Sequence, residues 1–229
     1  IVGDVDLELQ FNAIQFNNGS FSLTSQIRGF NSAGDTETLT IFMTSEALLD
    51  LSGLTFANWG AQDDIVEIYG DLTAETITAT TQRDLILSGN GNDLVYGGNG
   101  RDSAELGGGN DLYLDTGQGN AFGRDTVAGG GGNDTINGGI GNDTMTGNDG
   151  ADLFAFGETS GVDVITDFVS GTDILQISNA VNGSSLTSAA AVVAAATASG
   201  SDLVIDLGGG NNVTLQNVAT IAEADISIV

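Results

Sequence analysis

Residues 88–113 read SGNGNDLVY, GGNGRDSAE and LGGGNDLY, three successive units in which a glycine-rich turn ends in an aspartate. Residues 129–154 repeat the pattern as GGGGNDTIN, GGIGNDTMT and GNDGADLF. Within each stretch the aspartate returns every nine residues, and an apolar residue stands two positions after it. Repetition with a fixed period predicts a solenoid, in which each unit adds a layer to a stack.

The repeated aspartates fall into two groups of four. They are Asp84, Asp93, Asp102 and Asp111, followed by Asp125, Asp134, Asp143 and Asp152. The apolar residues two positions later are Ile86, Val95, Ala104, Tyr113, Val127, Ile136, Met145 and Phe154. The step from Asp111 to Asp125 breaks the period, because it is five residues longer than the others.

Each triplet that follows an aspartate is long enough for one short strand with a single inward side chain. Two turns and two strands then make a coil of eighteen residues, so alternate aspartates lie on the same edge of the stack. The predicted columns are Asp84, Asp102, Asp125 and Asp143 on one edge and Asp93, Asp111, Asp134 and Asp152 on the other. The predicted fold class is therefore all-β, a parallel β-roll or β-solenoid.

The turns combine the residue types that a calcium ion needs. Glycine permits positive φ and lets backbone carbonyl groups crowd around an ion, and calcium takes six to eight oxygen ligands at about 2.3–2.6 Å. The alternative is a metal-free solenoid whose Gly-Asn-Asp corners are simply solvated. Stacked carboxylates without a counter-ion would repel each other by roughly 1 kcal/mol per pair even in water, so the pattern favours calcium.

From Ala79 to about Ala155 the repeats resemble the nonapeptide G-G-x-G-x-D-x-U-x of the RTX (repeats-in-toxin) family. The resemblance implies a β-roll that binds several Ca²⁺ ions, stacked along both edges. In that family the earlier turn supplies the carbonyl groups at its second and fourth positions and its aspartate. The later turn supplies the carbonyl groups at its first and third positions and its aspartate.

Carried over to this chain, a typical site uses Gly89, Gly91 and Asp93 together with Leu106, Gly108 and Asp111. The other residues that the resemblance assigns to metal sites are Asp84, Gly97, Gly98, Asn99, Gly100, Asp102, Gly107, Gly109, Asp125, Gly129, Gly130, Gly131, Gly132, Asp134, Gly138, Gly139, Ile140, Gly141, Asp143, Gly147, Asp149 and Asp152. Two stretches depart from the family pattern. The turn before Asp84 contains no glycine, so its ligand set differs from the family's, and residues 115–124 hold the insertion. We expect a bulged loop there, with weaker or missing calcium sites beside it.

The composition excludes many kinds of site. The 229 residues include 31 acidic and 4 basic ones, for a formal net charge of −27, and no Cys, His or Pro. Thiol nucleophiles, disulfides, zinc fingers and Ser-His-Asp triads are therefore excluded, and no enzyme is visible in these residues. So negative a chain repels nucleic acid and anionic lipid. The longest apolar run, Ala189–Ala196, is too short for membrane insertion.

The flanking sequences divide the chain into three predicted parts. They are a small β-strand segment over 1–45, interpreted as the end of a preceding domain, the β-roll over 46–160, and a C-terminal cap with a type I secretion signal over 161–229. Within the roll, metal-free coils are expected in 46–78 and calcium-binding repeats in 79–160. The metal-free coils keep the rhythm of the repeats but lack their glycine pairs.

The cap is predicted to combine strands with short helices. An alanine-rich helix over 188–199 begins with Ser188 as its N-cap. Strands over 202–207 and 212–216 flank a Gly-Gly-Gly-Asn turn and form a hairpin. A capping box at 220–223 opens a last short helix.

Residues 161–177 resemble the segment that follows RTX repeats in secreted proteases and alginate epimerases. The resemblance implies that this segment closes the open end of the roll. The residues that it buries there are Phe168, Ile174 and Leu175. Asp163, Asp167 and Asp173 have two interpretations, as ligands of one more ion or as solvated acids.

The resemblance also implies a bacterial protein that type I secretion exports to the cell exterior or cell surface, where calcium folds the repeats. The terminal segment Asp225–Val229 resembles the uncleaved signal of that pathway, with an edge strand as the alternative. The chain begins with Ile1 rather than Met, so a larger parent protein is expected. The expected partners are calcium, the type I secretion apparatus, and a cell-surface lattice or neighbouring subunits.

Two functions of the parent protein compete. One is structural, in a surface-layer (S-layer) or adhesin-like protein that the repeats anchor through calcium. The alternative is a secreted exoenzyme (protease, lipase or epimerase) that carries the repeats as its secretion and folding module. The absence of Lys, Cys and His and the metal-free coils over 46–78 favour the structural role.

Overall fold

The triplets after the repeated aspartates form short strands with one inward side chain. In the computed structural model, β10 (Leu94–Tyr96) has only its central Val95 buried. β14 (Thr135–Asn137) repeats this arrangement with Ile136. The structure describes residues 7–10, 20–22, 26–28, 38–43, 47–57, 64–115, 123–157 and 160–229.

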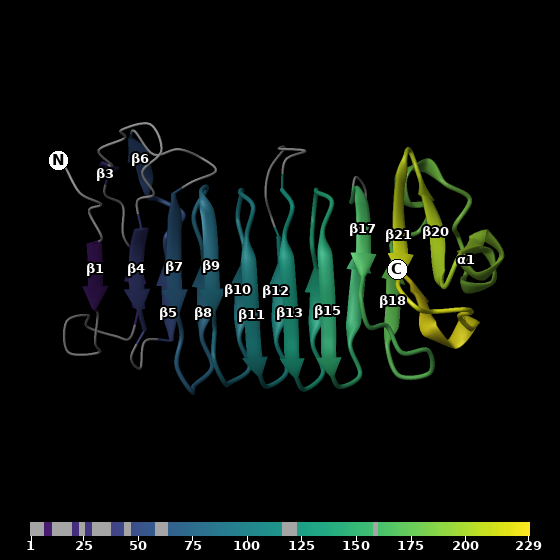
Figure 1. Cartoon of the computed structure of the whole chain (residues 1–229), viewed down its shortest axis with the longest axis horizontal. Coiled ribbons are helices and arrows are strands. Elements are labelled where there is room, and N and C mark those ends of the chain that lie inside the picture. Colours follow the sequence, from purple (N-terminus) through teal and green to yellow (C-terminus); the bar gives the residue numbers. More distant parts are fainter. Residues whose placement is uncertain are drawn as a thin grey trace.

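Two sheets run along the whole length of the stack (Figure 1). The long sheet contains, in spatial order, β1 (Leu7–Gln10), β4 (Thr38–Phe42), β7 (Ile65–Tyr69), β9 (Arg83–Leu87), β11 (Ser103–Gly108), β13 (Thr126–Gly131), β15 (Thr144–Asp149), β17 (Val162–Ile165), β21 (Asn211–Leu215), β20 (Asp202–Gly208) and β19 (Ala196–Ser199). The short sheet contains β2 (Ser20–Ser22), β5 (Leu48–Asp50), β8 (Thr76–Thr78), β10, β12 (Leu112–Leu114), β14, β16 (Leu153–Phe156), β18 (Ile174–Ile177) and β22 (Ile226–Ile228). A separate pair consists of β3 (Gln26–Arg28) and β6 (Thr55–Ala57). Among the described strands the pairing is parallel, except where β20 meets β19 and β21.

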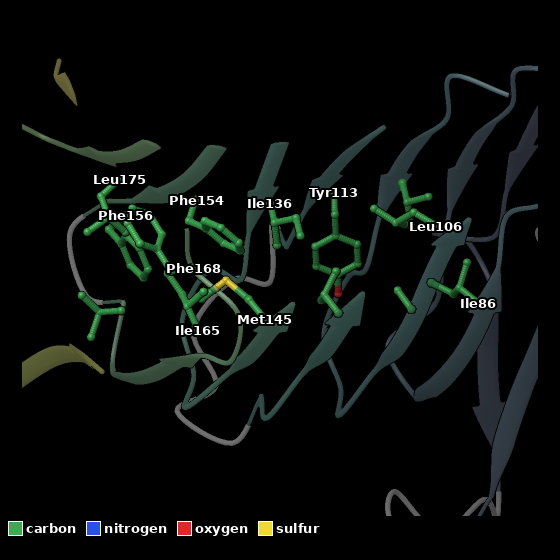
Figure 2. Packing of buried hydrophobic residues seen from close by; sticks show 14 of the residues in the cluster. Ile86, Leu106, Tyr113, Ile136, Met145, Phe154, Phe156, Ile165, Phe168 and Leu175 are labelled. Carbon is green, nitrogen blue, oxygen red and sulfur yellow. The ribbon is translucent and has the colours of Figure 1, made fainter. Parts of the chain in front are cut away.

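The core is a row of apolar side chains between the two sheets (Figure 2). Tyr113 pairs with Val95 on one side and Ile136 on the other, and Ile136 pairs with Phe154. All four side chains are fully buried. The predicted fold class, an all-β parallel solenoid with a short helix near the C-terminus, is confirmed.

The sheets extend upstream of the glycine-rich repeats. There β4, β7 and β9 have five residues each, two of which are buried. Leu39 pairs with Val66, and Val66 pairs with Asp84. Asp84, an acid of the repeats, therefore stands in the same column as the apolar Leu39 and Val66 of the upstream coils.

Strands also pair across the boundaries expected at residues 45 and 160. β1 pairs with β4, and β4 pairs with β7. At the other boundary β15 pairs with β17, and β16 pairs with β18. In the part of the chain that the structure describes, the two sheets therefore continue from the first segment into the cap.

The alanine-rich helix is shorter than predicted. α1 (Ala189–Ala195) begins as expected after Ser188, whose side chain accepts a hydrogen bond from the Ala191 N–H. The prediction that it reaches residue 199 is wrong, because the chain becomes extended at Ala196 and pairs with β20 as β19. Edge pairing in the cap therefore overrides the helix propensity of alanine.

The rest of the cap closes the end of the roll. The predicted hairpin is present as β20 and β21. Short 3₁₀ turns are η1 (Val181–Gly183) and η2 (Glu223–Asp225), and Ala222 rather than Thr220 is the residue that caps η2. No helix among the described residues is long and apolar enough to span a membrane.

Aromatic packing joins the cap to the last repeats. The rings of Phe168 and Phe154 lie 6.2 Å apart between their centroids, and both side chains are buried. Leu175 is fully buried as predicted. Ile174 is only partly buried, because it is the first of four strand residues that alternate between the outer and inner faces of β18.

The turn at residues 129–134 requires glycine at two positions. Gly130 and Gly132 have φ angles of 111° and 129°, a region in which an L side chain is strained. A Cβ on Gly132 would also overlap the carbonyl oxygen of Gly109 in the preceding coil. Gly131 lies between them without a left-handed φ, and the place of its Cβ is open space.

We predict that Gly132→Ala destabilises the fold and that Gly131→Ala does not. Backbone strain alone costs about 1–2 kcal/mol at Gly132, and the overlap with Gly109 adds to it. Urea unfolding in millimolar calcium, followed by far-UV circular dichroism, measures both free energies of unfolding. Equal unfolding midpoints for the two variants would contradict the stacking of these turns.

Candidate metal centres

Each repeated acid is hydrogen-bonded to the next coil. The Asp84 N–H donates to Asp102 Oδ1 at 2.9 Å, and the Asp102 N–H donates to Asp125 Oδ1 at 2.9 Å. Bonds of the same kind, at 2.8–3.0 Å, join all successive members of two columns. The long-sheet column is Asp84, Asp102, Asp125, Asp143 and Asp163, and the short-sheet column is Glu75, Asp93, Asp111, Asp134, Asp152 and Asp173.

The structure therefore brings all eight sequence-predicted aspartates into the two expected columns. The insertion does not disturb them. Asp111 and Asp134 are 23 residues apart, yet they make the same bond as Asp134 and Asp152, which are 18 residues apart. The bulged loop expected at the insertion falls largely on residues 116–122, which lie outside the described residues.

In seven of these acids one carboxylate oxygen is hydrogen-bonded, to the preceding coil in the aspartates and to the Thr73 hydroxyl in Glu75, and the other oxygen has no partner. These unpaired, buried oxygens are Glu75 Oε2 and the Oδ2 atoms of Asp93, Asp102, Asp111, Asp134, Asp143 and Asp152. The residues that carry them are at most 3% exposed. Burying a carboxylate without a compensating partner is expensive, so seven such oxygens indicate positions at which a cation completes the structure.

Backbone carbonyl groups border the same spaces. Asp134 Oδ2 lies in front of the α-carbon of Gly129, and the Gly147 carbonyl oxygen is 2.9 Å from the place where a Gly129 Cβ would stand. Asp143 Oδ2 lies 2.7 Å from the corresponding place at Gly138. Glycine at the first position of a turn therefore leaves room for the carboxylate oxygen, as a site for a large cation requires.

The described residues contain no group of three or more acidic side chains that could hold a metal ion. Any ion between two stacked turns would meet two carboxylates and would take its remaining ligands from backbone carbonyl groups. Calcium accepts such mixed oxygen shells, whereas magnesium demands near-ideal octahedral geometry and usually keeps several waters. The donor set therefore fits calcium.

The other predicted site residues lie in the turns between the sheets or in the adjoining ends of β11, β13 and β15. They are Gly89 and Gly91, Gly97 to Gly100, Leu106 to Gly109, Gly129 to Gly132, Gly138 to Gly141, and Gly147 and Asp149. Leu106 differs from the others because its side chain is fully buried in the core. Its carbonyl oxygen, the atom assigned to the site, accepts a hydrogen bond from Ser88 Oγ at 2.7 Å.

Asparagine side chains bind the coils in the opposite direction. Asn92 Oδ1 accepts the Asn110 N–H, and Asn110 Oδ1 accepts the Asn133 N–H, both at 2.7 Å. Asn133 Oδ1 accepts the Ala151 N–H at 2.9 Å. Each of these turns is thus fixed to the following coil through asparagine and to the preceding coil through its aspartate.

Two members of the long-sheet column already have donors for both carboxylate oxygens. The Thr80 hydroxyl donates to Asp84 Oδ1 at 2.9 Å, and the Thr80 N–H donates to Asp84 Oδ2 at 3.0 Å. Asp125 Oδ2 accepts a hydrogen bond from the Tyr113 hydroxyl at 3.2 Å. Figure 2 shows this Tyr113 ring between the two sheets. Protein groups therefore partly satisfy Asp84 and Asp125.

The sequence analysis missed or left open three members of the columns and one turn glycine. Asp163 and Asp173, which had two interpretations, accept the N–H groups of Asp143 and Asp152 and are buried. Each is followed two positions later by a buried apolar residue, the signal that could have identified it. Gly123 takes the place of a turn glycine after the insertion, since its carbonyl oxygen accepts the Asn142 N–H. Glu75 begins the short-sheet column.

Burial raises the pKa of most column acids, because it removes the charged form from water. The pKa rises to about 6 for Asp111 and Asp152, to about 7 for Asp125 and Asp163, and to about 8 for Asp143 and Glu75. Repulsion between neighbouring carboxylates adds to the shift, as at Asp102, whose pKa is raised well above its usual range next to Asp84 and Asp125. The columns therefore hold protons strongly when no cation replaces them.

Comparison with known proteins identifies the repeats. The family model of the RTX calcium-binding nonapeptide repeat (four copies) matches residues 69–104, 78–113 and 121–154. The chain thus carries RTX nonapeptide repeats that form a β-solenoid. RTX repeats bind calcium and are typical of extracellular bacterial proteins exported by type I secretion.

Several solved structures match the chain, and one of them is the following. The crystal structure of extracellular lipase LipA from Serratia marcescens is 16% identical with a TM-score of 0.35, and the alignment covers 86% of this chain and 45% of that one. The chain therefore spans less than half the length of that protein. No significant match was found among curated proteins.

We predict that acid stabilises the calcium-free stack. Six of the column acids (Glu75, Asp111, Asp125, Asp143, Asp152 and Asp163) have pKa values of about 6–8 in the fold, and such acids have pKa values of about 4 in an unfolded chain. Protonation therefore favours folding, and the stabilisation is lost as the pH rises through the folded values. In calcium-free buffer the far-UV β signal should be larger at about pH 5 than at about pH 8. A β signal that grows with pH without calcium would contradict this.

Proposed function

We propose that these RTX repeats are a calcium-binding module that folds on calcium outside the cell and serves as a structural or anchoring part of a type I-secreted surface protein. The observation that carries the proposal is the set of seven buried carboxylate oxygens without partners, placed along both edges of one solenoid. We assign the role of ligands to the two columns of acids and to the carbonyl groups of the turns. The chain itself then acts by binding and folding rather than by catalysis.

The charge of the chain explains why calcium would control folding. The net charge of −27 is concentrated in part in the two columns, where stacking brings carboxylates into adjacent coils. Without a cation these carboxylates must repel each other or take up protons. At extracellular calcium concentrations, ions that bind only the stacked state stabilise it by mass action.

Export and placement at the cell surface are the finer parts of the proposal. A chain that stays loose at low calcium suits passage through a secretion apparatus before it folds outside. The segment assigned to the secretion signal, Asp225–Val229, contains β22, which pairs with β18 at the end of the short sheet. The structural role is supported by the length of the solenoid, in which apolar coils and repeat coils share the same two sheets.

We predict that calcium, but not an equal concentration of magnesium, produces the full β spectrum at neutral pH. The carbonyl-lined turns suit a large, flexible coordination shell, and magnesium holds its waters too strongly to enter them. A calcium titration should be steep, with a Hill coefficient well above one, because stacking a coil orders eighteen residues at roughly 1–2 kcal/mol of backbone entropy each. Several ions must share that cost.

Far-UV circular dichroism of the chelated chain, titrated with each metal, makes this measurement. Chelator followed by excess calcium is the control for reversibility. A chelated sample at neutral pH that keeps its full β spectrum would show that calcium does not drive folding. Hyperbolic, independent binding would show that the sites exist before calcium arrives.

The anchoring role requires its own experiment. Fluorescently labelled chain should bind source cells whose surface layer has been removed with chelator, and it should do so only when calcium is returned. Labelled chain with Asp134→Asn and Asp143→Asn, which weakens both columns, is the matched control and should bind less. A wild-type chain that folds in calcium but neither binds the cells nor self-associates would favour the exoenzyme module instead.

A further inference from the structure

The turn at residues 70–75 stacks on the next coil as the glycine-rich turns do, although its sequence contains a single glycine. The Asn90 N–H donates to the Asp71 carbonyl oxygen at 2.9 Å, just as the Gly108 N–H donates to the Gly89 carbonyl oxygen at 2.9 Å one coil later. The Glu75 N–H donates to Asp93 Oδ1 at 2.9 Å, and the Asp93 N–H donates to Asp111 Oδ1 at 2.8 Å. The backbone contacts of a repeat turn are therefore present here.

The carbonyl groups of this turn contact the following turn at the same two positions as in the glycine-rich repeats. The carbonyl oxygens of Asp71 and Thr73 lie where the Cβ atoms of Gly89 and Gly91 would stand, as those of Gly89 and Gly91 do for Gly107 and Gly109. In the opposite direction, the Ser88 carbonyl oxygen lies in front of the α-carbon of Gly70. The exposed Leu72 side chain points away from this space, since it is 75% exposed.

Two carboxylate oxygens between these turns are buried without a partner. They are Glu75 Oε2 and Asp93 Oδ2, on residues that are each 2% exposed. The other Glu75 oxygen, Oε1, lies 2.9 Å from the Thr73 hydroxyl, so the turn fixes the carboxylate in place. One held oxygen and one unpaired oxygen is the arrangement expected of a ligand awaiting a cation.

The corresponding turn on the opposite edge differs at its acid. Residues 79–84 also place the carbonyl oxygens of Thr80 and Gln82 against Gly98 and Gly100. However, the N–H and hydroxyl of Thr80 occupy both oxygens of Asp84, at 2.9–3.0 Å. Asp84 therefore has no unpaired carboxylate oxygen to offer an ion.

We infer that a calcium ion binds between the turns at 70–75 and 88–93, with Glu75 and Asp93 as its carboxylate ligands, and that the calcium column on the opposite edge begins only at Asp102. This site lies in coils that the sequence predicts to be metal-free, and Asp84, which the sequence assigns to a site, is left out. The inference rests on the proposed function, because it assumes that the repeats bind calcium.

The test compares two isosteric variants of the full chain, Glu75→Gln and Asp84→Asn. Native mass spectrometry in calcium counts the ions bound to each, and circular dichroism in saturating calcium verifies that each is folded. Glu75→Gln should bind one ion fewer than the wild type. Asp84→Asn should bind the same number as the wild type, which makes it the matched control.

The outcomes separate this inference from the proposed function. A wild-type chain that binds no calcium contradicts the function itself. A wild-type chain that binds calcium, with no loss in Glu75→Gln or with one ion lost in Asp84→Asn, overturns the inference alone. If Glu75→Gln fails to fold, anomalous diffraction from crystals of the calcium-loaded wild type decides. A peak between Glu75 and Asp93, with none between Asp84 and Asp102, supports the inference, and the absence of that first peak overturns it.

Discussion

The rest of the structure depends on one hydrogen bond, from the backbone N–H of an acidic residue to the carboxylate of the acid one coil later. This bond fixes the register between coils at the corner where each turn enters a strand. It also draws the carboxylate out of water, and in six of the aspartates the second oxygen is left unpaired. A neutral side chain would give the same register without that consequence. The choice of an acid therefore makes the stack depend on a cation or on protons.

The upstream coils show what the same position does without an acid. Leu39 and Val66 occupy the register that Asp84 takes one coil later, and all three side chains are fully buried. Burying an aliphatic side chain stabilises a fold by about 1.5–3 kcal/mol, whereas burying an uncompensated carboxylate costs several kcal/mol. One solenoid therefore joins coils with an apolar residue at this position of the long sheet to coils whose stability depends on a cation or on protons.

The sequence was sufficient to predict the columns because their signals are local. The nine-residue step and the apolar residue after each aspartate follow directly from the geometry of a turn and a three-residue strand. The shortened α1 was not predictable in this way, because the pairing of Ala196 with Ile205 is a tertiary contact. Glu75 was overlooked for a related reason. Glycines with a left-handed φ mark the turns that admit a carbonyl oxygen from the preceding coil. Asp71 and Thr73 do not have a left-handed φ, so their turn needs no glycine at these positions. The carbonyl groups that this turn presents to the next coil belong to the backbone and carry no sequence signal.

The two columns differ in continuity, and this bears on how cooperative each can be. In the short-sheet column every acid from Glu75 to Asp152 has a buried oxygen without a partner, so neighbouring ions would share carboxylates along an unbroken row. In the long-sheet column, Thr80 satisfies Asp84, and the Tyr113 hydroxyl partly satisfies Asp125 next to the insertion. Because Asp125 already has a protein donor, an ion gains less binding free energy there. The cooperativity between ions at Asp102 and at Asp143 is weakened as a result. Tyr113 belongs to β12 of the short sheet, so its side chain links the two columns through the core. When the short-sheet column is ordered, the Tyr113 hydroxyl is held in place to donate to Asp125 of the long-sheet column.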